Sequence, residues 1–144
     1  MARGLRNLAL YFLIWTVVGL FFFSQSISQK LASHDPTPWW HYLTSWLLGV
    51  YISAALTPAI LWLGRRFPFE RRNWLRRTAQ HLAFSVCFAI VQVVVESAII
   101  PRLGIFPAVM PTFVATLVVM TLIAFHQTMA TYWMVLGIQY GIGY

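Results

Sequence analysis

A short basic block between two long apolar runs constrains most strongly how this chain folds. The block spans residues 65–77, reads RRFPFERRNWLRR and holds six of the ten Lys and Arg residues. Lys and Arg in short loops between membrane spans stay on the cytoplasmic side. The block therefore predicts an integral membrane protein and the way it faces. The residues that set this topology and meet lipid head groups are Arg65, Arg66, Arg71, Arg72, Arg76 and Arg77.

Composition agrees with a membrane location. The 144 residues leave room for one domain, and 60% are hydrophobic, 9% are charged and the mean hydropathy is +0.71. Soluble domains carry roughly a quarter charged residues. The net charge of +7 would also fit a nucleic-acid-binding protein, but the basic residues lie in loops beside apolar runs. We therefore exclude nucleic acid and interpret anionic membrane lipids as the partner of the basic block.

Four segments are long and apolar enough to cross a membrane, since a spanning helix needs about 20 mostly apolar residues. They predict one all-α domain over residues 1–144, with spans at about 8–27, 42–64, 78–100 and 112–136. The first span resembles a signal peptide, but no small-x-small cleavage site follows it, so we expect an uncleaved helix. The last span contains no Gly, Pro or Asn, which predicts one continuous helix.

The distribution of basic residues predicts that both chain ends face the cytoplasm. Arg3 and Arg6 precede the first span, and the basic block follows the second. Lys30 and Arg102 are the only basic residues of the two opposite loops. The excess of eight basic residues against two gives an N-in/C-in topology.

Polar residues inside predicted spans are the candidate functional residues, because such residues are costly in lipid. His81, Ser85, Gln92 and Glu96 are four, seven and four residues apart, which places them on one face of the third span. Glu96 is the only acidic residue within an apolar span. The signal-sensing candidates are Glu96, Gln92, His126 and His81.

Each of these residues also has a purely structural interpretation. Glu96 could be an interfacial carboxylate hydrogen-bonded to its neighbours, and His126 could bridge two helices. Pro58 in the second span is a hinge candidate, or it merely curves that helix, and Thr57 could satisfy a carbonyl that it frees.

No catalytic or metal-binding motif is present in the sequence. It lacks a phosphate-binding glycine loop, a plausible Ser-His-Asp set and a His-x-x-x-His pair, so we assign no catalytic residue. Cys87 is the single cysteine and lies in an apolar run, where it predicts a small packing residue. We assign no metal site and no cofactor to this chain.

Two segments resemble a known family. They are LTPAILWLGRRFP at residues 56–68, followed by Trp74 and His81-Leu82, and YWMVLG at residues 132–137. Together they resemble the N-terminal membrane region of sensor histidine kinases of the LytS/YehU-like internal-region family. The resemblance covers nearly the whole chain, but it rests on helix-end patterns and not on catalytic residues.

The resemblance implies the membrane sensor and anchor of a dimeric, autophosphorylating kinase in the bacterial inner membrane. It implies a homodimer and a cytoplasmic response regulator, reached through a kinase module that is absent here and would use ATP and Mg²⁺. Tyr144 would then end a fragment, and no histidine of this chain has the context of a phosphoacceptor. The alternative is a small stand-alone membrane protein, such as a transporter half or a helical subunit of a complex. A third class, an integral-membrane lipid enzyme, would need acidic or His residues at one interface, where the basic block offers only Glu70.

Overall fold

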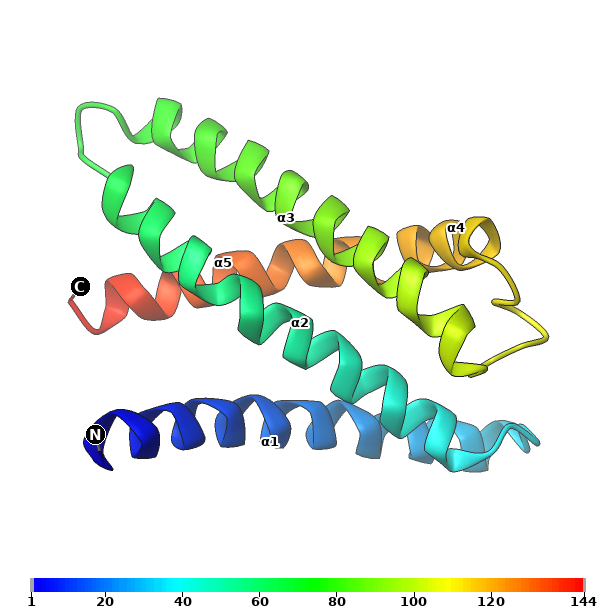
Figure 1. Ribbon diagram of the computed structural model, residues 1–144. Helices are drawn as coiled ribbons and strands as arrows, with labels where there is room; N and C mark the ends of the chain where they lie inside the picture. Colours follow the sequence, from blue (N-terminus) through cyan, green and yellow to red (C-terminus); the bar gives the residue numbers. More distant parts are fainter. Residues whose placement is uncertain (1, 144) are drawn as a thin grey trace.

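The computed structural model describes residues 2–143, and within them every regular element is a helix (Figure 1). The five helices are α1 (Ala2–Ser33), α2 (Trp39–Arg66), α3 (Trp74–Leu103), α4 (Phe113–Ile123) and α5 (Phe125–Gly141). The expectation of an all-α chain is confirmed.

Three of these helices, α1, α2 and α3, are each long and apolar enough to cross a membrane. Helices α4 and α5 form a fourth candidate span when taken together. These lengths and compositions indicate a multi-pass membrane protein. The first three helices also extend beyond the predicted spans. Helix α3 passes through Pro101, where we expected it to have ended, and stops at Gly104, whose φ of +66° favours glycine.

The prediction of one continuous last helix is wrong. The chain bends by 56° between α4 and α5, and Ala124 joins them without any Gly or Pro. The Ala124 carbonyl accepts hydrogen bonds from both the backbone N–H and the hydroxyl of Thr128, each at 2.9 Å. The Thr121 hydroxyl bonds the Leu117 carbonyl about two turns earlier. Threonine hydroxyls that bond the carbonyl four residues back commonly bend helices, which gives the physical reason for the break.

Helix α2 is the centre of the arrangement. It packs against α1, α3 and α5, while α3 also contacts α4 and α5. Helix α1 contacts no helix other than α2, and its outer side exposes large apolar residues such as Leu13, Ile14 and Val17. Both marked chain ends and the loop between α2 and α3 lie at the same end of the bundle (Figure 1). We call this the basic-loop end.

Pro58 is accommodated in α2 through a hydrogen bond from a neighbouring helix. Because proline has no N–H, it leaves the carbonyl of Ala54 without its usual donor. The Tyr11 hydroxyl on α1 donates to this carbonyl at 2.5 Å. We expected Thr57 to satisfy a freed carbonyl, but its hydroxyl donates instead to the backbone carbonyl of Ser53 at 2.7 Å. The hinge role of Pro58 stays a prediction.

Candidate functional site

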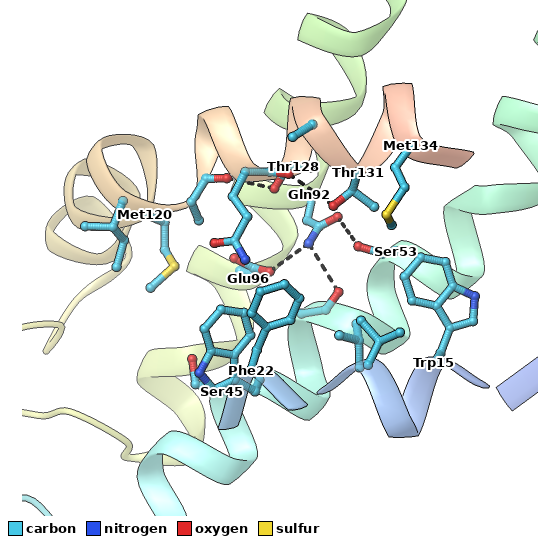
Figure 2. Close-up of a pocket in the computed structure, with 18 residues that line it drawn as sticks. Trp15, Phe22, Ser45, Ser53, Gln92, Glu96, Met120, Thr128, Thr131 and Met134 are labelled. Carbon is cyan, nitrogen blue, oxygen red and sulfur yellow. Dashed lines mark hydrogen bonds between the residues drawn. The ribbon is translucent and has the colours of Figure 1, made fainter. Parts of the chain in front are cut away.

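A cavity of about 560 Å³ lies between α1 and the α4–α5 pair (Figure 2). Since α1 contacts neither α4 nor α5, these helices leave a space above α2 and α3, which form its floor. Ile123 and Met134 at its rim are at least half exposed. We call this partly open space the intramembrane cleft. Its size is typical of small-molecule sites.

Gln92 organises the polar floor of the cleft. Its side-chain N–H groups donate to the Gly49 carbonyl at 3.2 Å and to Glu96 Oε1 at 3.1 Å (Figure 2). Its carbonyl oxygen accepts a hydrogen bond from the Ser53 hydroxyl at 2.8 Å. Ser53, Gln92 and Glu96 are all buried. The floor therefore joins α2 and α3 by a connected set of hydrogen bonds, and Ser53 is a member that the sequence analysis did not single out.

Glu96 lies at the cleft with one oxygen bound and the other without a partner. Only 6% of the residue is exposed, and Oε1 accepts from Gln92. Among residues 2–143 no group bonds or pairs with Oε2. A methyl group at Gly49 would lie 3.1 Å from Oε1, so the glycine leaves room for this carboxyl group between α2 and α3. Glu96 forms no ion pair with Arg102, which lies six residues further along the same helix.

Aromatic and sulfur-containing side chains surround this floor. Phe22 and Trp46 stack with ring centroids 4.9 Å apart, and the Trp46 indole N–H donates to Ser26 at 2.7 Å. These bonds fix the indole ring at the wall of the cleft. The remaining apolar wall comes from Trp15, Val18, Val50, Met120, Ile123 and Met134. Gln127, Thr128 and Thr131 of α5 add polar groups to the wall.

His126 does not belong to the cleft. Its side chain is exposed and has no hydrogen-bond partner in the described range 2–143, so it does not bridge helices as expected. It lies two residues from the buried Thr128, which corresponds to about 200° around the helix. Thr128 and Thr131, which lie close to His126 in the sequence, both line the cleft.

His81 is fully buried, as a residue on the predicted polar face should be, but it lies towards the basic-loop end. Its Nε2 is 2.9 Å from the Phe67 carbonyl, and its Nδ1 is 2.7 Å from the Tyr132 hydroxyl. A carbonyl only accepts, so in the neutral ring Nε2 carries the proton and Nδ1 accepts from Tyr132. The Phe69 ring stacks on the imidazole with centroids 4.9 Å apart. His81 thus joins α3, α5 and the loop after α2.

The last turns of α5 contact the same loop. The Tyr140 hydroxyl donates to the Gly64 carbonyl at 3.0 Å and accepts from the Phe69 N–H at 3.2 Å. Gln139 donates to the Leu61 carbonyl at 2.9 Å. One helix therefore lines the cleft with its first half and binds the α2 terminus and the basic loop with its second half.

The basic block is mostly exposed. Arg65, Arg66, Arg71, Arg72 and Arg76 are exposed, whereas Arg77 is half-buried. The guanidinium groups of Arg66 and Arg77 lie 5.8 and 5.5 Å from the centroid of the Phe67 ring, within cation–π range. Arg77 also donates to Gln80 at 3.0 Å.

At the opposite end of the bundle, two residues that the sequence analysis did not predict to be structural hold the loops. The buried His41 Nδ1 accepts from the Phe106 N–H at 2.9 Å. Asp35 accepts hydrogen bonds from the Tyr42 hydroxyl and from the N–H and hydroxyl of Thr37. These hydrogen bonds stabilise the carboxylate and lower the pKa of Asp35 to about 2, and the bond from Tyr42 has the largest effect.

The comparisons with known proteins add no relative. No protein-family model, curated protein or solved structure matches the chain significantly. The resemblance to sensor histidine kinases stays a prediction from the residues quoted above. In residues 2–143 no three His, Cys, Asp or Glu side chains lie together as candidate metal ligands.

Proposed function

We propose that this chain is the membrane sensor and anchor of a two-component histidine kinase. The intramembrane cleft is the sensing site, and α5 carries its state to the cytoplasmic side. In this proposal the chain lies in the bacterial inner membrane with both ends in the cytoplasm, and it acts as a homodimer. A kinase module outside this chain would use ATP and Mg²⁺ and pass phosphate to a response regulator.

The observation that carries this proposal is the double role of α5. Thr128, Thr131 and Met134 line the cleft, and five residues beyond Met134 begin the contacts of Gln139 and Tyr140 with Leu61, Gly64 and the basic loop. A helix of 17 residues is about 25 Å long, so α5 reaches from the cleft to the loop as one rigid element.

Occupancy of the cleft biases α5 only if a ligand binds two arrangements of the helices differently. The bend at Ala124 supplies an element for such a difference, because Ile123 and Ala124 before it and Thr128 after it all line the cleft. A ligand that contacts both sides of the bend favours one bend angle. Any change in that angle moves the last turn of α5 against the basic loop.

Packing at the basic-loop end favours a sensor over a transporter half. Between the cleft and the loop, His81, Tyr132, Leu136 and Ile60 have at most 2% of their surface exposed. These side chains close the bundle on that side, whereas a transport path would need polar space through it.

Phosphorylation of the native protein tests the proposal. Protein captured from host membranes with an antibody to residues 65–77 should incorporate acid-labile phosphate from ATP. Ala130 lines the cleft, and the variant Ala130→Trp should fill it. In this variant the rate of phosphorylation should no longer change with membrane composition, because the cleft can no longer exchange occupants. The control Ala55→Trp places the same bulk on an exposed site of α2 outside the cleft and should behave like wild type. Absence of histidine phosphate in the captured protein would refute the kinase assignment.

The predicted topology is tested by cysteine labelling. In a Cys87→Ser background, Glu70→Cys should react with a membrane-impermeant maleimide only after the cytoplasmic side is opened, and His34→Cys should react in intact cells. The reverse pattern would contradict the N-in/C-in topology.

A further inference from the structure

We propose that the intramembrane cleft binds a lipophilic cation, a molecule with an apolar body and one positive charge that pairs with the Glu96 carboxylate. The inference rests on the proposed function only in that the sensing site and this binding site are the same cleft. It names the chemical class of the ligand, which the proposed function leaves open.

The first argument is that the protein supplies no cation to Glu96. The residue is more than nine-tenths buried, and its only hydrogen bond comes from the neutral amide of Gln92. Within residues 2–143, Glu96 forms no ion pair. Acidic groups buried in a membrane bundle are costly and normally pair with a group of opposite charge. A positively charged partner would therefore come from outside the described residues, and the unpartnered Oε2 is available to it.

The second argument is the charge of the cleft. Among residues 2–143 its lining contains no Lys, Arg or His, and Glu96 is the single ionisable residue of that lining. The two basic residues of the loops opposite the basic block do not pair with Glu96 either, since Lys30 donates to the Asp35 carbonyl at 2.5 Å and Arg102 forms no ion pair with Glu96. An anionic ligand would therefore meet repulsion without any compensating cation.

The third argument is the nature of the wall beside the carboxyl group. The Phe22 ring lines the same cleft as Glu96 and stacks on Trp46 (Figure 2). Aromatic faces attract cations within about 6 Å of the ring centroid, and the attraction grows when water is excluded. Trp15, Met120 and Met134 offer apolar, polarisable surface for the rest of the ligand. A charge-selective point inside an apolar, aromatic space fits a lipophilic cation.

Three probes of one shape and different charge test this inference. The chain is placed in bilayer discs of an uncharged galactolipid, and binding of tritiated tetraphenylphosphonium is measured. Uncharged tetraphenylsilane and anionic tetraphenylborate serve as competitors. We expect the cation to bind about tenfold more tightly than the neutral probe, a difference of about 1.4 kcal/mol. We expect the anion not to compete.

Matched variants locate the charge effect. Glu96→Gln keeps the shape of the side chain and should weaken cation binding about tenfold while leaving the neutral probe unaffected, which also reports an intact cleft. Glu70→Gln removes a carboxylate from the exposed basic loop and should change nothing. If Glu96→Gln fails to fold, Phe22→Leu decides, since loss of the ring should weaken only cation binding.

The outcomes separate this inference from the proposed function. Equal affinity for cation and neutral probe in wild type and in Glu96→Gln overturns the cation inference. The cleft still stands as a binding site in that case if Ala130→Trp abolishes binding of both probes. Binding that is insensitive to Ala130→Trp refutes the cleft as the sensing site and overturns both. If added phosphatidylethanolamine displaces the probe cation, the natural ligand is a lipid with a cationic head group. If the probe cation is retained, the natural ligand is a free molecule.

Discussion

Replacement of Gly64 by alanine should loosen the contact between α2 and α5. Gly64 is buried, and α5 approaches its backbone closely enough for the Tyr140 hydroxyl to bond the Gly64 carbonyl at 3.0 Å. A methyl group at this position would lie 2.8 Å from Leu136 Cδ1 and closer still to Gln139 Oε1. Carbon atoms pack best at about 3.5–4.0 Å, so both side chains must move.

The magnitude follows from three opposing effects. Alanine gains about 0.5–1 kcal/mol over glycine in a helix. Overpacking of a filled contact costs about 1–3 kcal/mol. Rotation of Gln139 also breaks its hydrogen bond to Leu61, and bonds between membrane helices contribute about 0.6–1.7 kcal/mol. The two losses outweigh the gain, so we expect a net destabilisation of about 1–4 kcal/mol.

Reversible unfolding of the purified chain in mixed micelles measures this difference. The control is Gly137→Ala, the same substitution in α5 at a site where a methyl group would have no neighbour within 4 Å. Both variants gain the same helix propensity, so their difference isolates the clash. The variant Gly64→Ala/Gln139→Ala should recover part of the loss. If Gly64→Ala is as stable as Gly137→Ala, the packing argument is wrong.

Three further predictions concern hydrogen bonds of individual side chains. Tyr11→Phe should destabilise the chain by about 0.6–1.7 kcal/mol by leaving the Ala54 carbonyl unsatisfied, and Pro58→Ala should cancel this loss by restoring an N–H donor, as read by the same unfolding assay. Tyr132→Phe removes the donor to His81 Nδ1, so imidazole ¹⁵N shifts should change in this variant and not in the exposed His126. Because the folded-state pKa of Asp35 is lowered from 3.8 to about 2, the stabilisation by its carboxylate is present above pH 3.8 and is lost as pH falls through about 2. Carboxyl ¹³C titration checks this, and an unshifted titration would contradict the loop geometry.

Spacing in the sequence located the polar face of α3 correctly. His81, Ser85, Gln92 and Glu96 are all buried on the bundle side of that helix. The prediction worked because α3 has the length and apolar composition of a membrane-spanning helix, and polar groups of such helices are expected to face the bundle interior. Their partners were not predictable, since Ser53 and Gly49 lie some 40 residues away in sequence and meet Gln92 only through packing.

The same reasoning did not work for α5 because several polar residues compete there. Of the four polar residues in this segment, His126 is exposed outside the cleft, whereas Gln127, Thr128 and Thr131 line it. The spacing of Gln127, Thr128 and Thr131 at one and three residues marks a shared side, which was the signal for the cleft wall. We interpreted His126 as functional because it is ionisable. A threonine tolerates burial more easily, because its hydroxyl can bond a backbone carbonyl of its own helix.

The bend between α4 and α5 has no sequence signal of the usual kind, and the reason lies in α4 itself. Its eleven residues are apolar on all sides, and only Thr116 and Met120 are buried. A helix that is apolar all round can turn any side towards lipid at equal cost, so its direction is set by the neighbours it packs against. Here α4 packs against α3, and the hydroxyl of Thr128 donates a hydrogen bond to the Ala124 carbonyl at the break. Because Ala124 and Thr128 both line the cleft, the bend that the sequence did not predict is also the element on which the proposed sensing depends.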